Sequence, residues 1–362
     1  MKYQAGAILA LLGASAAHAG GIERSTQSAM ILYSEGTRVE LSYGSVSPSL
    51  TGTDVATVDI SNVGKTFGLP SFAVKTDVTD KIAVALIYDK PFGADIEYGS
   101  ASPVLGGTMA QADVTALTLL AKYQFTERLS AFGGVRFQQA DGEITLSGLA
   151  YSTLSGYNVE LNDGSGTGYV LGGAYEIPEI ALRVALTYNS AIEHEFDTVE
   201  YNPMIGSGLT STLKSKTPES WNLEFQTGVA ADTLLFGSVR YAKHSQFKVD
   251  PTYGPDLVDL DDTTTYRIGV GRRFNPKLSG SISVAYEAAG DKLVSPLAPS
   301  TGSTSVSLGL AYKVTEQLEI SGGISKIWLG DADPETGTPD VARAYFTDND
   351  ATAIGLKIAY TF

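Results

Sequence analysis

Cysteine is absent from the 362-residue chain, which excludes disulfides, metal–thiolate sites and thiol nucleophiles. Without disulfides, an exported chain of this length needs a large core or a closed hydrogen-bonded sheet to hold it together. Positive charge is also scarce, because 25 Lys and Arg against 40 Asp and Glu leave a formal net charge of −15. Proteins that bind nucleic acid carry a basic footprint, so this balance excludes nucleic acid as a partner.

Long hydrophobic runs are missing beyond residue 19. A helix that spans a membrane needs roughly 18 consecutive apolar residues, and the longest runs, such as 82–88, have the length of a strand. Only helices and closed barrels satisfy every backbone group in lipid. The mature chain is therefore either soluble or a membrane barrel.

The sequence also lacks catalytic patterns, since only His194 and His244 follow the first 19 residues and no G-x-S-x-G motif is present. His244 and Ser245 are adjacent in a predicted strand, so their side chains point to opposite faces. We predict that the protein is not an enzyme and that His244 faces the barrel lumen. The acidic stretches 256–262 and 331–340 lack EF-hand spacing. We expect no cofactor and no metal site, and interpret these stretches as solvated loops or cation bridges to lipopolysaccharide.

The first residues have the order of an export signal. Lys2 supplies a positive start, 5–16 form an uncharged Ala/Leu-rich core, and Ala17-His18-Ala19 has the A-x-A pattern of a cleavage site. We predict a signal peptide at 1–19, with the mature chain beginning at Gly20. The alternative is a buried N-terminal helix.

What the mature sequence contains is typical of a β-barrel. It has 39 glycines and 19 tyrosines, and strand-length segments with period-two hydrophobicity recur along it. In 354–362, for example, Ile, Leu, Ile, Tyr and Phe alternate with Gly, Lys, Ala and Thr. The candidate strands are 37–48, 64–77, 81–98, 112–125, 128–147, 166–177, 180–199, 218–230, 232–249, 264–274, 277–289, 303–314, 317–330 and 351–362.

The connections between these segments alternate without a break between short turns and long loops. The long loops are 49–63, 99–111, 148–165, 200–217, 250–263, 290–302 and 331–350. A membrane barrel has this arrangement, with short periplasmic turns and long extracellular loops. We therefore predict an all-β protein, a transmembrane antiparallel β-barrel of about 14 strands over 37–362, preceded by a short N-terminal plug segment at 20–36.

Several motifs occur in the order found in one known family. The run 80–93, DKIAVALIYDKPFG, resembles a "DK-x-apolar…PFG" strand, and 182–194, LRVALTYNSAIEH, resembles an "R-V-G-x-S-Y-R-S-x-x-x-H" strand. Pro218 followed by 237–247 resembles a "P…W-S-x-F" strand pair. Together they resemble the FadL/TodX family of outer-membrane long-chain fatty-acid transporters. The resemblance implies a monomeric fourteen-stranded barrel in the bacterial outer membrane. The plug at 20–36 is shorter than in that family and lacks its Asn-Pro-Ala element.

Pro91, Phe92 and Gly93 are the candidate exit for cargo. Proline donates no hydrogen bond to a sheet and glycine in a strand marks a bend, so together they should open the wall locally. The alternative is that the strand ends near residue 88 and Pro91 lies in a loop. The resemblance implies a lateral exit into the membrane at this kink, and an external groove at 99–109 whose contacts include Leu105 and Met109.

Alternation places ionisable side chains inside the barrel, because facing lipid would be costly. Arginine can hold a carboxylate in a bidentate pair. The candidates for a fatty-acid head group are Arg136, Arg183, Arg240 and Arg267. The alternative is a structural ladder in which these arginines pair with Glu224 and Glu287.

The sequence thus predicts passive transport of long-chain fatty acids or other small hydrophobic molecules. The expected partners are such a ligand and the lipid and lipopolysaccharide of the outer membrane. A general diffusion porin with a water-filled lumen is the alternative function. A third hypothesis is a structural or adhesive barrel that acts through its loops.

Overall fold

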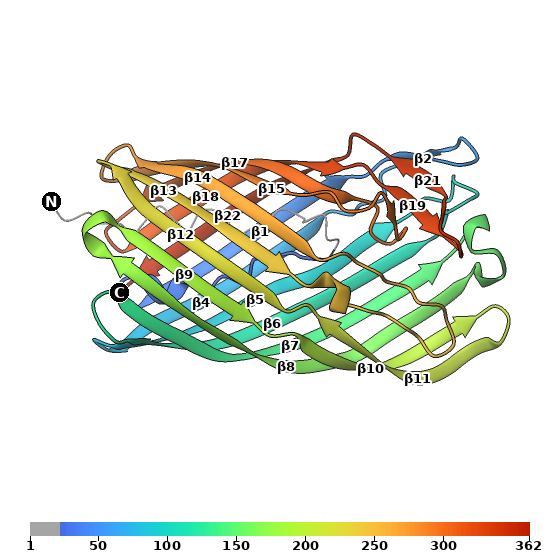
Figure 1. Ribbon diagram of the computed structural model, residues 1–362, viewed down its shortest axis with the longest axis horizontal. Helices are drawn as coiled ribbons and strands as arrows, with labels where there is room; N and C mark the ends of the chain where they lie inside the picture. The colour runs from blue at the N-terminus through green and yellow to red at the C-terminus, as the bar shows by residue number, and fades with distance from the viewer. Residues whose placement is uncertain (1–21) are drawn as a thin grey trace.

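The computed structural model describes residues 22–362. The predicted signal peptide and the predicted mature start at Gly20 lie outside the described residues. The wall is one antiparallel sheet that closes on itself as a barrel (Figure 1). The first and last wall strands pair along their whole length, from Arg38 opposite Thr361 to Ser49 opposite Asp350. Within 22–362 no helix is long and apolar enough to cross a membrane.

Sixteen strand segments form the wall. They are β1 (Arg38–Ser49), β4 (Phe67–Thr79), β5 (Ile82–Glu97), β6 (Met109–Gln124), β7 (Leu129–Leu146), β8 (Tyr157–Ile177), β9 (Leu182–Asn189), β10 (Ile192–Asn202), β11 (Gly206–Thr217), β12 (Ser220–Ala230), β13 (Thr233–Ala242), β14 (Thr263–Arg273), β15 (Leu278–Glu287), β17 (Thr301–Lys313), β18 (Leu318–Gly330) and β22 (Asp350–Thr361).

Two pairs of these segments are single strands with an interruption. β9 continues into β10, and β11 continues into β12. The pairing of β9 with β12 ends at Asn189 opposite Ser220, and the pairing of β10 with β11 begins at Ile192 opposite Thr217. Both β9 and β10 pair with β8. Counting β9–β10 and β11–β12 as one strand each gives a closed barrel of 14 strands, which confirms the predicted fold.

Short turns gather at one end of the barrel, the turn end, and long connections at the other, the loop end (Figure 1). The loops carry two small sheets of their own. Their strands are β2 (Gly52–Asp54), β3 (Asp59–Ile60), β21 (Ala344–Phe346), β16 (Leu293–Val294), β19 (Asp333–Thr336) and β20 (Val341–Ala342). The 3-10 helices are η1 (Met30–Tyr33), η2 (Leu149–Leu154), η3 (Pro178–Ile180) and η4 (His244–Gln246).

Side chains of the wall alternate between an apolar outer face and a small or polar inner face. In β22, the outward side chains of Ile354 and Leu356 are 58% and 55% exposed, while the inward side chain of Ala353 is 1% exposed. In β15, Ile282 points outward and Ser283 is buried inside. An outer face of large apolar residues suits lipid and would be unusual in water.

The structure departs from the predicted strands at several places on the loop-end half, and β8 already begins at Tyr157, inside the predicted loop 148–165. Residues 200–217, predicted as a loop, contain the end of β10 and all of β11. Most outward residues of this hairpin are polar, with Lys214 bonded to Glu193 and only Val199 and Tyr201 apolar or aromatic on the exposed face of β10, so no sustained apolar alternation marks it. Residues 243–249, predicted as strand, instead leave the wall through η4. The neighbouring strand has Pro218 at this level, and proline offers no N–H to continue the pairing.

The interior of the barrel is filled from both ends. The N-terminal segment, residues 22–36, lies inside the lumen, and η1 packs there against β4, β5 and β6. From the loop end, residues 243–262, which we call the inward segment, contribute Val249, Leu257 and Val258 to the main buried cluster. The N-terminal segment and the inward segment therefore divide the lumen.

Candidate functional site

The wall has a window between β4 and β5. The two strands pair from the turn end up to Phe72 opposite Tyr88. Bonding resumes only near the loop end, where Lys65 N donates to Asp95 O over 3.0 Å. Between these points, β4 residues 67–71 remain paired with β1, while β5 carries a bulge between Asp89 and Phe92. Within the described chain, 67–71 and 89–94 thus face each other without a shared ladder.

The N-terminal segment occupies the β5 side of this window. Pro91 O accepts hydrogen bonds from Arg24 N at 2.8 Å and Ser25 N at 3.3 Å, and Gly93 N donates to Ile22 O at 2.8 Å. Glu23 and Phe92 form an isolated antiparallel bridge. The segment thereby takes up backbone groups that β4 leaves unbonded, which matters because unbonded backbone groups are costly in lipid.

Gly93 permits this close approach. A Cβ atom at this position would lie 2.6 Å from Arg24 Nε and 2.8 Å from Ala112 O. The Arg24 guanidinium lies over the Phe67 ring at 4.0 Å and forms an ion pair with Asp95 at 3.3 Å. Arg24 therefore bridges the two sides of the window, from β4 to β5.

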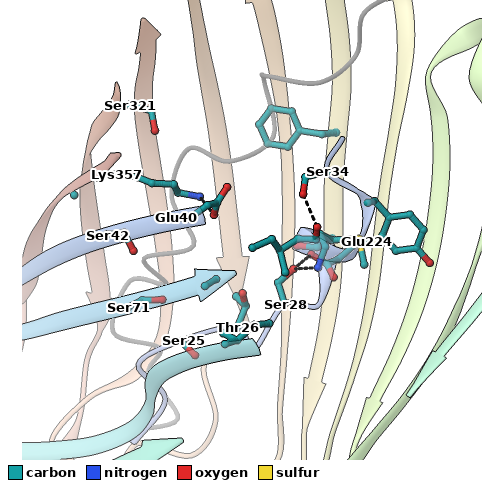
Figure 2. A pocket seen from close by; sticks show the side chains of 18 of the residues that line it. Ser25, Thr26, Ser28, Ser34, Glu40, Ser42, Ser71, Glu224, Ser321 and Lys357 are labelled. Atoms are coloured by element: carbon teal, nitrogen blue, oxygen red, sulfur yellow. Dashed lines mark hydrogen bonds and ion pairs between the residues drawn. The ribbon is translucent and has the colours of Figure 1, made fainter. Parts of the chain in front are cut away.

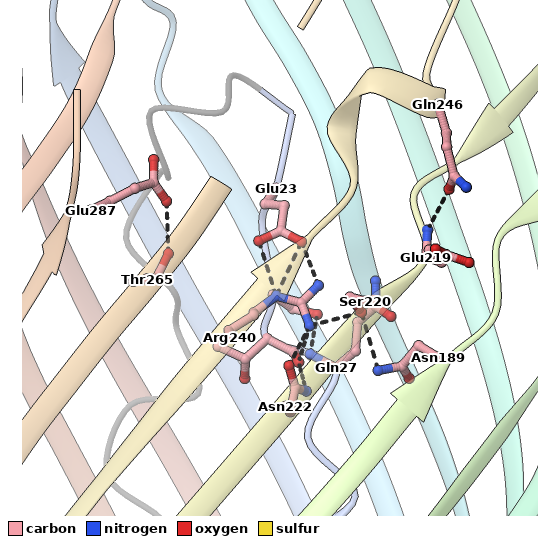
Figure 3. Close-up of polar contacts among 12 residues, drawn as sticks. Glu23, Gln27, Asn189, Glu219, Ser220, Asn222, Arg240, Gln246, Thr265 and Glu287 are labelled. Carbon is pink, nitrogen blue, oxygen red and sulfur yellow. Dashed lines mark hydrogen bonds and ion pairs between the residues drawn. The ribbon is translucent and has the colours of Figure 1, made fainter. Parts of the chain in front are cut away.

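Arg240 is fully bonded and holds the N-terminal segment. Its Nε donates to both oxygens of Glu23, at 3.1 and 3.0 Å (Figure 3). The same guanidinium donates to Ser220 Oγ at 3.0 Å and Asn222 Oδ1 at 2.6 Å. The side chains of Arg240 and Glu23 are 4% and 1% exposed. A bidentate, charge-assisted pair of this kind is strong and directional, so Arg240 fixes the N-terminal segment to β13.

Arg136 and Arg183 are also engaged. Arg136 Nε donates to Thr118 Oγ1 at 2.8 Å, and its Nη1 donates to Asn189 Oδ1 at 3.0 Å and to Gln27 Oε1. Arg183 Nε donates to Glu176 Oε1 at 2.8 Å. The expected carboxylate partners, Glu224 and Glu287, are bonded elsewhere, to Ser28 and Thr265. Arg136 and Arg183 thus bond to wall and N-terminal residues other than the expected Glu224 and Glu287.

Arg267 differs from the other three arginines. It is half-buried, lines the large lumen cavity, and no hydrogen bond or ion pair described for residues 22–362 involves its guanidinium. The side chain on the lumen side of β14 therefore remains able to bind an anion.

The large cavity lies between the N-terminal segment and the wall and has a volume of about 540 Å³. Serine hydroxyls from several strands point into it, together with the ion pair of Lys357 and Glu40 at 3.1 Å (Figure 2). Ser28 closes one side by donating to Glu224 at 2.8 Å. We call it the hydroxyl-lined cavity, and its chemistry suits water or polar groups.

A second cavity of about 80 Å³ lies nearer the loop end, between the wall and the inward segment. Ile22, Phe92 and Gly93 form its border with the window, and the inward segment contributes Val249 and Val258. We call it the apolar cavity. The window thus borders both cavities, since Leu69, Pro70 and Lys90 line the other one.

The remaining predicted residues lie outside these cavities. Leu105 is 0% exposed and packs in a cluster of loop residues with Leu50 and Phe346. Met109, the first residue of β6, is half-buried. His244 lies in η4 and is 0% exposed. Sequence reasoning missed the residues of the N-terminal segment that hold the plug, because 22–28 have no periodic pattern.

Comparison with known proteins identifies the family of the chain. The family model described as outer membrane protein transport protein (OMPP1/FadL/TodX) matches residues 10–362. The chain belongs to the FadL/TodX family. Its members are outer-membrane transport proteins, which confirms the predictions of an outer-membrane barrel and of a transporter for hydrophobic compounds rather than an enzyme. No curated protein sequence matches the chain.

Solved structures share the FadL/TodX fold with this chain. A FadL homologue from Pseudomonas aeruginosa has a TM-score of 0.75 at 13% identity, with 92% of each chain covered. The toluene transporter TbuX of Ralstonia pickettii has a TM-score of 0.65 at 14% identity, with 91% of this chain and 90% of that chain covered. The toluene transporter TodX of Pseudomonas putida gives 0.65 at 14%, covering 97% and 99%. These likenesses establish the fold.

Proposed function

We propose that this barrel passively carries long-chain fatty acids or other small hydrophobic molecules into the outer membrane through the window beside Pro91, Phe92 and Gly93. The observation that carries the proposal is the missing ladder between β4 residues 67–71 and β5 residues 89–94. Neighbouring wall strands are otherwise expected to pair along their length, because backbone groups that face lipid must be hydrogen-bonded. The N-terminal segment bonded at Pro91 and Gly93 would act as the gate.

The order of the cavities supports a route. Cargo would arrive at the loop end, near the connection that carries Leu105 and Met109, and would pass into the apolar cavity. Phe92 and Gly93 line that cavity and border the window. An apolar molecule gains free energy when it leaves water for the bilayer. Sideways release would therefore be downhill, whereas release through the hydroxyl-lined cavity into the periplasm would not.

Two classes of cargo are compatible with this route, and names of relatives include both a FadL homologue and toluene transporters. For a fatty acid, the carboxylate needs a cationic partner. Of the four predicted arginines, Arg267 is the one whose guanidinium has no bonded partner within the described residues. We assign the head group to Arg267, with the other three holding the plug and the wall.

A cross-link across the window tests the proposal. Pro70 and Lys90 lie on its two sides and both line the hydroxyl-lined cavity. With no cysteine in the chain, Pro70→Cys with Lys90→Cys can be joined by a thiol-specific bifunctional reagent. Uptake of labelled oleate and toluene, in cells without another route, should fall at least about tenfold after joining and recover with a cleavable linker. Undiminished uptake by the joined protein would refute the lateral route.

The matched control is Val74→Cys with Leu86→Cys, a pair of register partners where β4 and β5 are already bonded. Joining this pair should leave uptake unchanged, because it closes nothing. Lower uptake by both joined proteins would point to restricted motion of β4 and β5 in general and would also count against the window.

A general diffusion porin is the second candidate, and the hydroxyl-lined cavity of about 540 Å³ favours it. A porin would show steady ion conductance in planar bilayers, and the cross-link at the window would not alter solute passage. A gated transporter would be closed to ions for most of the time because residues 22–28 are bonded across the lumen.

The proposal includes three further expectations. Export would remove residues 1–19, which an N-terminal sequence beginning at Gly20 would demonstrate. The barrel would act as a monomer, since one chain closes the wall. The outward face would contact lipid and lipopolysaccharide directly.

A further inference from the structure

Two polar side-chain atoms of residues that line the apolar cavity have no hydrogen-bond partner among the described residues. His194 on β10 and Ser215 on β11 are register partners, and both line the cavity. They are 1% and 5% exposed. Within residues 22–362, His194 Nε2 and Ser215 Oγ have no hydrogen-bond partner. Thr217, two residues further along β11, donates to Gln138 at 2.9 Å and is satisfied.

Two adjacent unbonded groups at one depth are unexpected in a folded protein. A buried polar group without a partner destabilises the fold, and the large majority of buried polar groups in native structures are bonded. His194 and Ser215 are placed by the β10–β11 register and not by a loop. The His194 ring also stacks on Phe196, with 6.0 Å between centroids. Their positions are therefore fixed by the wall.

We propose that His194 and Ser215 form a subsite for a hydroxyl group, so that the cargo of the apolar cavity is a neutral hydrophobic molecule with one hydroxyl, such as a single-ring phenol. A serine hydroxyl both donates and accepts, and the imidazole Nε2 accepts, because the other ring nitrogen donates to the Ile192 backbone. The pair therefore offers one donor and one acceptor together. A hydroxyl is a small group that uses both, because it donates one hydrogen bond and accepts another. This inference rests on the proposed transport function and specifies the cargo.

The rest of the lining argues against other classes of cargo. No Lys or Arg is among the described residues that line the cavity, and Asp141 is present, so a carboxylate would meet no counter-charge there. A hydrocarbon such as toluene would fit the apolar walls but would leave both polar atoms unbonded. Sites built around a hydrogen bond discriminate strongly against analogues that lack it. Phe92, Phe196 and Phe247 supply ring surface for an aromatic cargo.

The test uses one ring with three substituents. Purified full-length protein in nanodiscs is equilibrated with labelled p-cresol, toluene and p-toluate, and the dissociation constants are compared. We expect p-cresol to bind at least about tenfold more tightly than toluene, as one satisfied polar pair implies, and p-toluate, which Arg267 in the other cavity can hold, to displace labelled p-cresol less effectively than toluene does. Equal affinity for p-cresol and toluene would overturn the proposal.

Variants assign the effect to the two residues. Ser215→Ala and His194→Phe should each weaken p-cresol binding about tenfold while leaving toluene binding unchanged or tighter. His194→Gln, which keeps a polar donor and acceptor, should retain most of the preference for p-cresol. Ser307→Ala is the control, because Ser307 bonds Ser325 at 2.9 Å and lines the other cavity. A preference for p-cresol that survives in Ser215→Ala and His194→Phe would also overturn the proposal.

The two hypotheses fail separately. Binding to nanodisc-held protein requires no passage through the window. Unchanged uptake after the Pro70–Lys90 cross-link would therefore refute the lateral route and leave the hydroxyl subsite standing. Loss of the p-cresol preference alone would refute the subsite and leave the lateral route standing. Folding of each variant is checked by the heat-dependent electrophoretic shift of an intact barrel.

Discussion

At the scale of single residues, three of the lumen arginines are bonded within the protein, and the fourth, Arg267, is the one that we propose holds a ligand. Arg267→Gln should weaken binding of a long-chain fatty acid at least about tenfold, because a charge-assisted hydrogen bond contributes about 1.5–3 kcal/mol. The methyl ester of the same acid should bind unchanged. Arg183→Gln is the control, since Arg183 bonds Glu176 at 2.8 Å. Equal losses for acid and ester would contradict this role of Arg267.

The sequence could predict where these residues point but not what they contact. Period-two alternation places Arg240 inside the barrel, and it is buried there. Its partner Glu23 lies 217 positions away in a segment with no periodic pattern. Nothing in the local sequence relates the two. The same holds for His194 and Ser215, whose lack of partners depends on how the inward segment fills the lumen.

At the scale of elements, strand β5 combines a bulge, a proline and a closely approached glycine to form the window. Gly93→Ala should displace Arg24, because the new Cβ would lie 2.6 Å from Arg24 Nε, while Ala112 O at 2.8 Å on its other side is backbone. Overpacking costs about 1–3 kcal/mol, which shifts an equilibrium between gated and open forms roughly 5- to 150-fold. We expect higher uptake and higher ion conductance.

The control for this substitution is Gly322→Ala, another wall glycine, whose Cβ would lie 3.0 Å from Gly355 O and would have no atom of the N-terminal segment within 4 Å. It should leave uptake and conductance unchanged. Lower uptake by a fully folded Gly93→Ala protein would mean that the side chain blocks the window itself. The gate assigned to the N-terminal segment would then be wrong.

Strands could be predicted from the sequence where contact with lipid requires alternating apolar and small or polar residues. β15 and β22 have large apolar residues outward and small ones inward, and both were predicted within two residues of their observed bounds. β11 was not, because its outward residues include Lys214 and Lys216, which pair with Glu193. A strand outside lipid has no reason to show apolar alternation. Residues 243–249 keep some of that alternation but leave the wall once their neighbour reaches Pro218.

At the scale of the whole molecule, aromatic side chains mark a level on the barrel surface toward the loop end. Trp221 pairs with Tyr188 on one side and Tyr241 on the other, and its ring lies 4.7 Å from that of Tyr188. Such amphipathic rings prefer the head-group level of a membrane. The polar β10–β11 hairpin continues beyond this level, so it would project outside the bilayer.

Trp221 and Trp328 are the two tryptophans of the chain, and they are 45% and 49% exposed on the outer face. Their fluorescence therefore reports the depth of the barrel in lipid. In bilayers of brominated lipid, we expect both to be quenched, and more strongly by bromine near the head group than by bromine near the chain ends. Trp221→Phe and Trp328→Phe separate the two signals. Stronger quenching by aqueous iodide than by either lipid would place these rings in water, and the window beside Pro91 would then open to solvent instead of the membrane.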